Sequence, residues 1–456
     1  MKTLKSYIAA GATITLLLTS ISCKKSFYTD ANVNPNAPNS VPSSTLLTSV
    51  EVSLGYTQGG AGSQFTSLFT QQTFGAQRQA QAYYEYILTP ADPEYLWDQM
   101  YTDVMENDYT LMNQAKASNQ NEYYGIANVI MAYSLQVSVD MWGKMPYSTA
   151  LQGAANIQPT YDNDQTLYGT ILTLIETGET ALENSSRGNL VPTTDDVMYG
   201  GSEANWIQFA EAIKARIYIH QCKHGNVAYE DSAVAAVTRS GALSGGFVNA
   251  VINFGSSSTN NGPWYQFNNQ RGGYINFAPT TLIDSMIAMN DPRDSIFADV
   301  VASSPTYGAL GAYYGNSTSP VEFITTEELD LIMAEANVRL GNAAVAQAAY
   351  TAAITNNMNK LGVPTAEASA YLTGPEAILP ATAAAAIHQI GLQQWIVLYL
   401  NPEAWVSFRR NGSPALQPVA GSEVVRRMIY PNSEVTLNAA NCPAATMYLP
   451  QLFWDN

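Results

Sequence analysis

Charged side chains are scarce in this 456-residue sequence, and basic side chains are the scarcest. Only 12% of the residues are Asp, Glu, Lys or Arg, about half the usual share, and 20 basic residues stand against 37 acidic ones. The formal net charge is −17 at pH 7. A field of this sign repels the phosphate backbones of DNA and RNA, so we expect no nucleic-acid partner.

Cysteine and histidine are also rare, with three residues of each. Apart from Cys23, the sequence has only Cys222 and Cys442, which could form one bridge but no disulfide framework. His220 and His224 flank Cys222 and would share one helical face, as metal ligands can. Cys222 would point elsewhere, so we expect solvated helix residues here, and neither a metal nor a cofactor.

The apolar run from Ile8 to Ile21 is too short to span a bilayer, which takes about 20 apolar residues. Lys2 and Lys5 precede it, so residues 1–22 are typical of a secretory signal peptide. Small residues stand before Cys23 in a lipobox-like arrangement, which predicts lipidation of this cysteine and a stable membrane anchor. The alternative is ordinary signal-peptidase cleavage that leaves Cys23 as a free thiol.

Motifs of common enzyme classes are missing. The sequence contains no Gly-x-Ser-x-Gly, no His-Glu-x-x-His and no phosphate-binding glycine loop. Glu403, Trp405 and Arg409 could suggest catalysis, but the i, i+4 spacing of Trp405 and Arg409 favours a structural cation–π contact beside an ion pair. We therefore expect no enzyme, although a glycosidase needs only two facing carboxylates and stays open as an alternative.

Tyrosine, in contrast, is abundant with 28 residues, and hydrophobic residues make up 46% of the chain, enough for a large core. Residues 23–44 are rich in Asn, Pro and Ser, which suits a tether before a first helix near Leu46. Beyond it, apolar residues recur at the helical period. This period predicts helices over residues 126–137, 167–182, 206–217 and 329–340.

Residues 326–358 are typical of a helix–turn–helix pair. Thr325 and Glu328 fit a capping box at its start, and Gly341 fits a left-handed residue after the first helix. Asn342 can then start the second helix. Several such pairs suggest a stack like a tetratricopeptide array, although no clean 34-residue repeat is present.

The pattern changes between residues 241 and 279 to Gly, Ser, Asn and aromatic residues without a helical period. We expect a functional loop here, because its aromatic density argues against disorder. Together with residues 77–86, it offers the aromatic faces, amides and guanidinium groups that capture a neutral oligosaccharide. The alternative is that these rings only pack. The candidate ligand-binding residues are Trp264, Tyr265, Asn268, Arg271, Arg78, Tyr83, Tyr84 and Tyr86.

Six short stretches follow one another in a distinctive order and spacing. They are the Asn- and Pro-rich residues after Cys23, DMWGKMPYSTAL at 140–151, NDPR at 290–293, LIMAEA at 331–336, EAWVSFRRNG at 403–412 and RRMIYP at 426–431. Each is weak alone, but together they span nearly the whole chain after Cys23. In these stretches the sequence resembles the SusD/RagB family of outer-membrane nutrient-binding lipoproteins of Bacteroidetes.

The resemblance implies a mainly α fold, in which tetratricopeptide-like helix pairs form a superhelical scaffold beside a less regular, loop-rich binding part. We expect a single domain over residues 45–456, with the loop-rich insert at about 241–279. The implied function is binding of an oligosaccharide and its delivery to a TonB-dependent, SusC-like transporter, with an oligopeptide as the alternative ligand. The lipid on Cys23 would anchor the protein to the outer membrane, facing the cell surface.

Overall fold

Helices dominate the part of the chain that the computed structural model describes, which is residues 41–184, 190–299 and 308–456. This confirms the predicted mainly α fold. The predicted signal peptide, Cys23 and nearly all of the predicted tether lie outside the described residues. Residues 43–456 form one unit. None of the described helices has the length and hydropathy that a membrane crossing requires.

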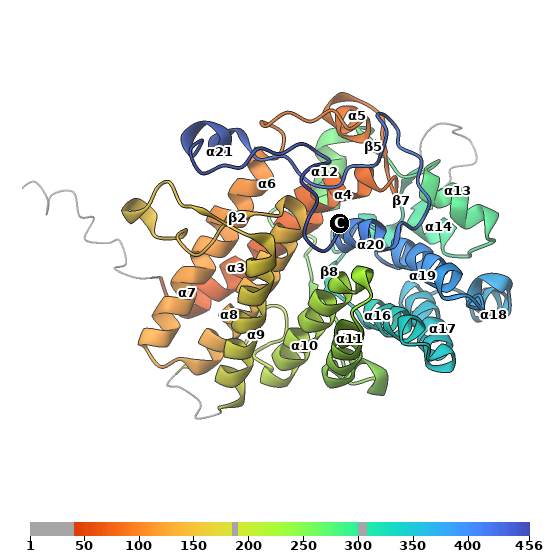
Figure 1. Ribbon diagram of the computed structural model, residues 1–456, viewed down its shortest axis with the longest axis horizontal. Coiled ribbons are helices and arrows are strands. Elements are labelled where there is room, and N and C mark those ends of the chain that lie inside the picture. The colour runs from red at the N-terminus through yellow and green to blue at the C-terminus, as the bar shows by residue number, and fades with distance from the viewer. Residues whose placement is uncertain (1–40, 185–189, 300–307) are drawn as a thin grey trace, which may run out of the picture. The chain divides into compact units, whose positions relative to one another are not determined.

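Four pairs of consecutive helices form the scaffold (Figure 1). Neighbouring pairs also touch, because α10 contacts α8 and α9, α11 contacts α16, and α16 contacts α19. The tetratricopeptide-like prediction is therefore confirmed. The pairs are α8 (Asn121–Trp142) with α9 (Asp164–Glu183), α10 (Glu203–His220) with α11 (Val227–Ser240), α16 (Thr326–Arg339) with α17 (Ala343–Leu361), and α19 (Ala383–Val397) with α20 (Glu403–Asn411).

The remaining helices are shorter or interrupted. The chain enters through α3 (Ser43–Thr57), a π-helical turn η1 (Gln58–Gly62) and α4 (Ser63–Phe69), and further on α6 (Glu94–Asp98) continues through a second π-helical segment, η2 (Gln99–Met105), into α7 (Glu106–Ala117). The others are α5 (Arg78–Tyr84), α12 (Pro263–Arg271), α13 (Thr281–Ala288), α14 (Asp294–Phe297), α15 (Ala312–Gly315), α18 (Thr365–Leu372) and α21 (Asn432–Leu437), with 3₁₀ turns η3 (Gly153–Ala155), η4 (Gln221–His224), η5 (Ala242–Ser244) and η6 (Pro375–Ala377).

The described strands are two to four residues long and form two-stranded antiparallel sheets, of which β1–β5 and β4–β8 join distant parts of the chain. The pairs are β1 (Phe74–Gly75) with β5 (Ile275–Asn276), β2 (Met145–Pro146) with β3 (Tyr161–Asp162), β4 (Ala250–Ile252) with β8 (Val321–Ile324), and β6 (Ala298–Asp299) with β7 (Ala309–Leu310). They act as clamps between helical segments and do not form a layer of their own.

The start of α16 corrects one detail of the predicted helix pair. Gly341 has the expected positive φ of 80°, and α17 begins directly after Asn342. However, the side chain of Thr325 makes no capping hydrogen bond. Instead, Oδ1 of Asn249 accepts from the Thr326 N–H at 2.9 Å, and Glu328 pairs with an arginine of another helix. The capping box is therefore wrong, because tertiary partners replace the local ones.

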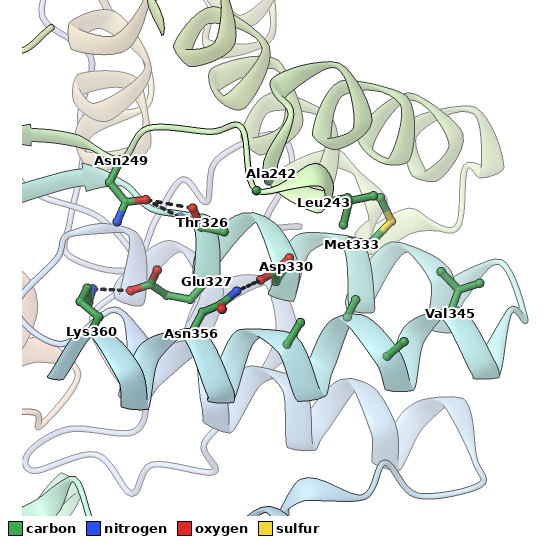
Figure 2. A pocket seen from close by; sticks show the side chains of 14 residues that line it. Ala242, Leu243, Asn249, Thr326, Glu327, Asp330, Met333, Val345, Asn356 and Lys360 are labelled. Carbon is green, nitrogen blue, oxygen red and sulfur yellow. Dashed lines mark hydrogen bonds and ion pairs between the residues drawn. The ribbon is translucent and has the colours of Figure 1, made fainter. Parts of the chain in front are cut away.

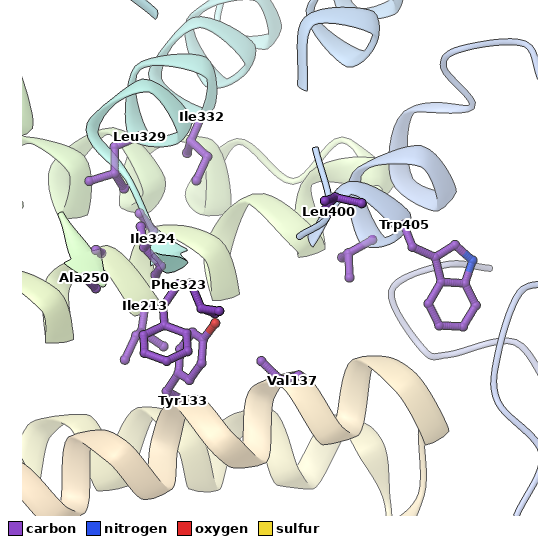
Figure 3. Close-up of a cluster of buried hydrophobic side chains, with 14 of the residues drawn as sticks. Tyr133, Val137, Ile213, Ala250, Phe323, Ile324, Leu329, Ile332, Leu400 and Trp405 are labelled. Atoms are coloured by element: carbon purple, nitrogen blue, oxygen red, sulfur yellow. The ribbon is translucent and has the colours of Figure 1, made fainter. Parts of the chain in front are cut away.

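The core lies where α8, α10, β8 and α20 meet. Figure 3 shows Tyr133 of α8 beside Phe323 of β8, and their ring centroids are 5.3 Å apart. On α20, the guanidinium of Arg409 lies 4.0 Å from the ring centroid of Trp405, which confirms the predicted cation–π contact. Both side chains are buried, so the EAWVSFRRNG stretch holds the fold together.

Buried charges cross-link the same helices. His220 donates from Nε2 to the Glu403 carboxylate at 2.8 Å, and its Nδ1 lies 2.9 Å from Oη of Tyr168, which donates to Asp140. Burial alone would raise the pKa of Glu403, but His220 and Arg216 lower it to about 2. The expectation of a solvated His220 is therefore wrong, since tertiary hydrogen bonds compensate its burial.

The three side chains of Asp140, His220 and Glu403 come close enough to share a metal ion. We interpret them as an ion-pair network, because Arg216 and Arg410 approach the Glu403 carboxylate within 4 Å and both imidazole nitrogens already face oxygen atoms.

The two cysteines after Cys23 are not bridged. Cys222 is buried, Cys442 is half-buried, and both are free thiols, so the disulfide that the sequence left open is not formed.

Asp108 on α7 is a buried acid without a partner. It is fully buried, and neither carboxylate oxygen accepts a hydrogen bond from any described residue. Burial raises its pKa well above the usual value, so the folded protein holds a proton that the unfolded chain releases near pH 4. The contribution of Asp108 to the free energy of unfolding is therefore fully present at low pH and is lost as pH rises toward the folded-state pKa.

We expect Asp108→Asn to raise the unfolding free energy at pH 7 by about 1–3 kcal/mol, because asparagine removes this proton linkage. The gain should fall to a few tenths of a kcal/mol near pH 4, where about half of the unfolded aspartate is protonated. Urea unfolding at pH 4 and pH 7 measures both values, with the exposed Asp231→Asn as control. A lower unfolding free energy of Asp108→Asn at pH 7 would contradict the assignment.

Candidate functional site

The two stretches predicted to bind ligand meet through the β1–β5 clamp. Phe74 pairs with Asn276 and Gly75 with Ile275, about 200 positions further along the chain. Directly beyond the clamp, the Ala76 N–H donates to the Tyr274 carbonyl at 2.9 Å. The pairing places α5, which follows β1, beside α12, which precedes β5.

An open cleft of about 740 Å³ lies between these elements and α3, η1, α4, α6 and η2. Its lining combines aromatic rings with a set of glutamine side chains and few charges. The rings belong to Tyr56, Phe65, Tyr83, Tyr95 and Phe267, the amides to Gln64, Gln79, Gln99, Gln266 and Gln270, and the charges to Asp92, Asp103 and Arg271.

Tyr83 and Arg271 are the two predicted ligand-binding residues that line this cleft. The Tyr83 ring packs 4.6 Å from that of Phe65, centroid to centroid, and its hydroxyl donates to Asp92 at 3.1 Å. Burial and the Asp92 carboxylate raise the pKa of Tyr83, although the nearby Arg271 opposes the shift. The hydroxyl therefore stays protonated at neutral pH, and the ring is held in a fixed orientation.

The kinked turn η1 borders the cleft through Gly60 and Ala61, and Gly60 has a non-helical backbone conformation with φ −95° and ψ −107°. The π-helical segment η2 borders the cleft through Gln99, and such segments are rare and are frequent at functional sites. In η1, a Cβ on Gly59 would overlap the side chain of Val321, so only glycine lets this turn pass β8. The run Gln-Gly-Gly-Ala-Gly at residues 58–62 could have indicated an interruption here, but it was not among the predicted site residues.

Gln99 presents a hydrogen-bond acceptor that no described residue satisfies. Its Oε1 atom is buried and receives no hydrogen bond within residues 41–184, 190–299 and 308–456. A buried amide oxygen without a donor is unfavourable, and rotation of the Gln99 amide toward the cleft would let a ligand hydroxyl reach this oxygen. No motif points to this residue, because a single glutamine at the start of η2 carries no pattern.

The structure corrects the placement of Trp264 and Tyr86, which are both buried. Trp264 is 5% exposed, its Nε1 donates to Ser63 at 3.0 Å, and its ring packs edge-on against Phe267. It points inward because α12 turns Trp264 toward the core. Neither ring is open to a ligand in the cleft.

The other four predicted residues lie on or beside the walls without lining the cleft. Arg78 is exposed at the start of α5, and Tyr84 of the same helix packs edge-on against Phe74. Tyr265 and Asn268 are half-buried on α12. Their roles as ligand contacts stay predictions.

The region from 241 to 279 is also more regular than its sequence pattern suggested. It contains η5, β4, β5 and the nine-residue helix α12, whose first residue is Pro263. Proline suits this position because its ring fixes a helical φ and its missing N–H is not needed there. The aromatic and amide residues of this stretch are thus carried on a helix and not on a loop.

These groups suit the capture of an uncharged, hydroxyl-rich molecule. Aromatic rings cover the apolar faces of sugar rings, and glutamine amides both donate to and accept from hydroxyl groups. Arg271 is the single cation among the described lining residues, and Asp92 already accepts hydrogen bonds from Tyr83 and Thr89. The arrangement therefore offers groups that bind hydroxyls and apolar sugar faces.

Comparisons with known proteins place the chain among SusD-like proteins. Residues 35–431 match the SusD-like family described as "Starch-binding associating with outer membrane". No curated protein sequence matches the chain.

Solved structures share its fold. A SusD-like protein of Bacteroidetes has 19% identity and a TM-score of 0.74, over 91% of this chain and 100% of that one. A SusD homologue from Bacteroides fragilis has 21% identity and a TM-score of 0.72, over 88% and 95%. A chitin-binding SusD homologue from Flavobacterium johnsoniae has 19% identity and a TM-score of 0.72, over 91% and 97%.

Proposed function

Because the chain belongs to the SusD-like family, whose members bind nutrients at the outer membrane, we propose that its aromatic and glutamine-lined cleft captures an oligosaccharide. The observation that carries this proposal is the combination of Tyr83, Phe267 and five glutamines around one open cleft of about 740 Å³. This volume lies within the range of small-molecule sites. The unsatisfied Oε1 of Gln99 adds an acceptor for a sugar hydroxyl.

The captured ligand is then passed to a TonB-dependent, SusC-like transporter in the outer membrane. Lipidation of Cys23 anchors the protein to that membrane, facing the cell surface. Both statements rest on family membership and on the lipobox-like residues before Cys23, which lies outside the described part of the chain. The protein performs no covalent chemistry on the ligand, so it is a binding protein and not a glycosidase.

Calorimetric titration of the purified protein against a panel of ligands tests this proposal. The panel contains malto-oligosaccharides, chito-oligosaccharides and uncharged oligopeptides, and mass spectrometry of each mixture detects cleavage. Chito-oligosaccharides are included because one structure with this fold is that of a chitin-binding protein. We expect saturable binding of at least one intact oligosaccharide.

Binding of oligopeptides alone would favour the alternative ligand class and contradict the proposal. Cleaved oligosaccharide would show a hydrolase and contradict the absence of catalysis. For an inverting or retaining glycosidase, two carboxylates about 5–10 Å apart would have to face the sugar. Asp92 and Asp103 are the acids of the cleft, so Asp92→Asn and Asp103→Asn would identify them as the source of any cleavage.

A further inference from the structure

A second cavity, of about 610 Å³, lies over the α16–α17 pair and shares no lining residue with the cleft described above (Figure 2). Its floor is formed by α16 and α17, and η5 with the following residues up to Asn249 closes one side. It therefore lies on the helical scaffold and not beside the π-helical segments.

Asp330 places a poorly compensated carboxylate in this groove. The residue is 2% exposed, and its Oδ2 accepts from Nδ2 of Asn356 at 2.8 Å. Its Oδ1 receives no hydrogen bond from any residue that the structure describes and is not enclosed by the protein, so a partner in the groove can reach it. Lys360 is the only cation among the described lining residues, and Glu322 and Glu327 already bind it. A buried carboxylate with a free oxygen calls for a cationic partner.

Apolar side chains stand beside this carboxylate. Leu243 is 53% exposed and Val345 is 50% exposed, and Ala348 of α17 lines the groove between them and the polar side. Figure 2 shows Leu243 and Val345 toward one end of the groove and Lys360 with Glu327 at the other. Exposed aliphatic side chains next to an unpaired acid are complementary to a chain that alternates aliphatic and basic groups.

Two amides provide further complementary groups. Asn249 uses its Oδ1 to accept hydrogen bonds from Thr326, so the Nδ2 of Asn249 stays available as a donor. Asn356 uses its Nδ2 to donate to Asp330, so the Oδ1 of Asn356 stays available as an acceptor. No described residue bonds either free atom. A donor and an acceptor at the edge of a groove suit the C=O and N–H groups of an extended peptide backbone.

We propose that this groove docks an extended peptide segment of a partner protein, with a lysine or arginine between aliphatic residues. The basic side chain pairs with Oδ1 of Asp330, and the aliphatic side chains cover Leu243 and Val345. The partner is thus recognised by charge and apolar contact, independently of the oligosaccharide in the other cleft.

Fluorescence anisotropy with a labelled Ala-Leu-Lys-Leu-Ala peptide tests the proposal on the purified protein. We expect saturable binding, at least tenfold tighter than that of the matching peptides with Glu or Gln in place of Lys. Asp330→Asn should weaken binding of the lysine peptide at least tenfold. The matched control Asp284→Asn removes one exposed carboxylate from α13 and should leave the affinity within twofold.

A second variant separates docking from any change in folding. Ala348 is exposed in the groove, so Ala348→Trp should block the peptide while thermal unfolding stays unchanged. The proposal would be overturned if the natural protein did not bind the lysine peptide at millimolar concentration. It would also be overturned if Asp330→Asn bound this peptide as tightly as the natural protein does, or if the natural protein bound the lysine and glutamate peptides equally well.

The pH dependence gives an independent readout. Burial and the neighbouring Glu327 raise the pKa of Asp330 to about 6, against the opposing hydrogen bond from Asn356. The charged groups of the groove are Glu327 on α16 and Lys360 on α17, and the η5 side contributes none. Affinity for the lysine peptide should therefore rise between pH 5 and pH 7.5, and Asp330→Asn should lose this rise. A rise that persists in the variant would contradict the role of Asp330.

Discussion

Tyr83→Ala is expected to weaken oligosaccharide binding by about 10- to 100-fold, the largest effect of any single change in the cleft. Loss of an aromatic face against a sugar removes about 1.5–3 kcal/mol of burial and stacking, and each 1.4 kcal/mol is a factor of ten in affinity. Tyr83 carries this effect because its contact with Phe65 and its hydrogen bond to Asp92 hold the ring in place. Calorimetric titration with the tightest oligosaccharide of the panel measures it.

Two further variants make this prediction specific. Tyr83→Phe keeps the ring and loses only the hydroxyl, so we expect its affinity to fall by less than about fivefold. Tyr124→Ala removes a half-buried tyrosine from α8, which is not among the residues that line the cleft, and should bind like the natural protein. Unchanged affinity of Tyr83→Ala, or an equal loss in Tyr124→Ala, would contradict the placement of the ligand.

Arg216→Met is expected to lower the free energy of unfolding by about 3–5 kcal/mol, because it leaves a buried carboxylate without its partner. The Arg216 side chain is 1% exposed and holds Glu328 through two hydrogen bonds, from Nε at 2.5 Å and from Nη2 at 2.7 Å. It also donates to the Phe323 carbonyl and lies 3.8 Å from Glu403. One side chain thereby links α10, β8, α16 and α20.

Arg239→Met is the matched control. This arginine pairs with Glu211 at 2.9 Å, but its side chain is 53% exposed. Glu211 is buried, but it keeps Lys214 as a partner at 3.0 Å when Arg239 is removed. Pairs with an exposed member contribute about 0–1 kcal/mol, so the unfolding free energy of Arg239→Met should change little. Adding Glu328→Gln to Arg216→Met should restore part of the loss, since the unpaired charge is removed. Equal losses in Arg216→Met and Arg239→Met, measured by urea unfolding, would show that the network does not hold the helices together.

The helix pairs could be predicted because their signals are long and repeated. The run from Ile126 to Val137 follows one helical face and lies inside the 22-residue α8. Helix α12 was missed because it is nine residues long and lies between glycines, and of its residues only Pro263 and Trp264 are buried. A pattern of two apolar residues cannot be told from a loop.

The position of the site was only partly predictable. Tyr83 and Arg271 could be selected from composition, since aromatic and guanidinium groups in polar surroundings favour sugar binding. Which rings turn outward depends on tertiary packing, and Trp264 turns inward to bond Ser63, about 200 positions away. Gln99 contributes through its place in a π-helical segment, which sequence spacing does not show. The buried role of His220 likewise depends on Tyr168 of α9 and Glu403 of α20.

The most direct test of the central claim is a crystal structure of the protein with the tightest oligosaccharide of the panel. We expect electron density for an intact sugar chain between α5 and α12, with a ring against Tyr83 or Phe267 and a hydroxyl that donates to Oε1 of Gln99. An oligosaccharide bound elsewhere, with this cleft empty, would contradict the account.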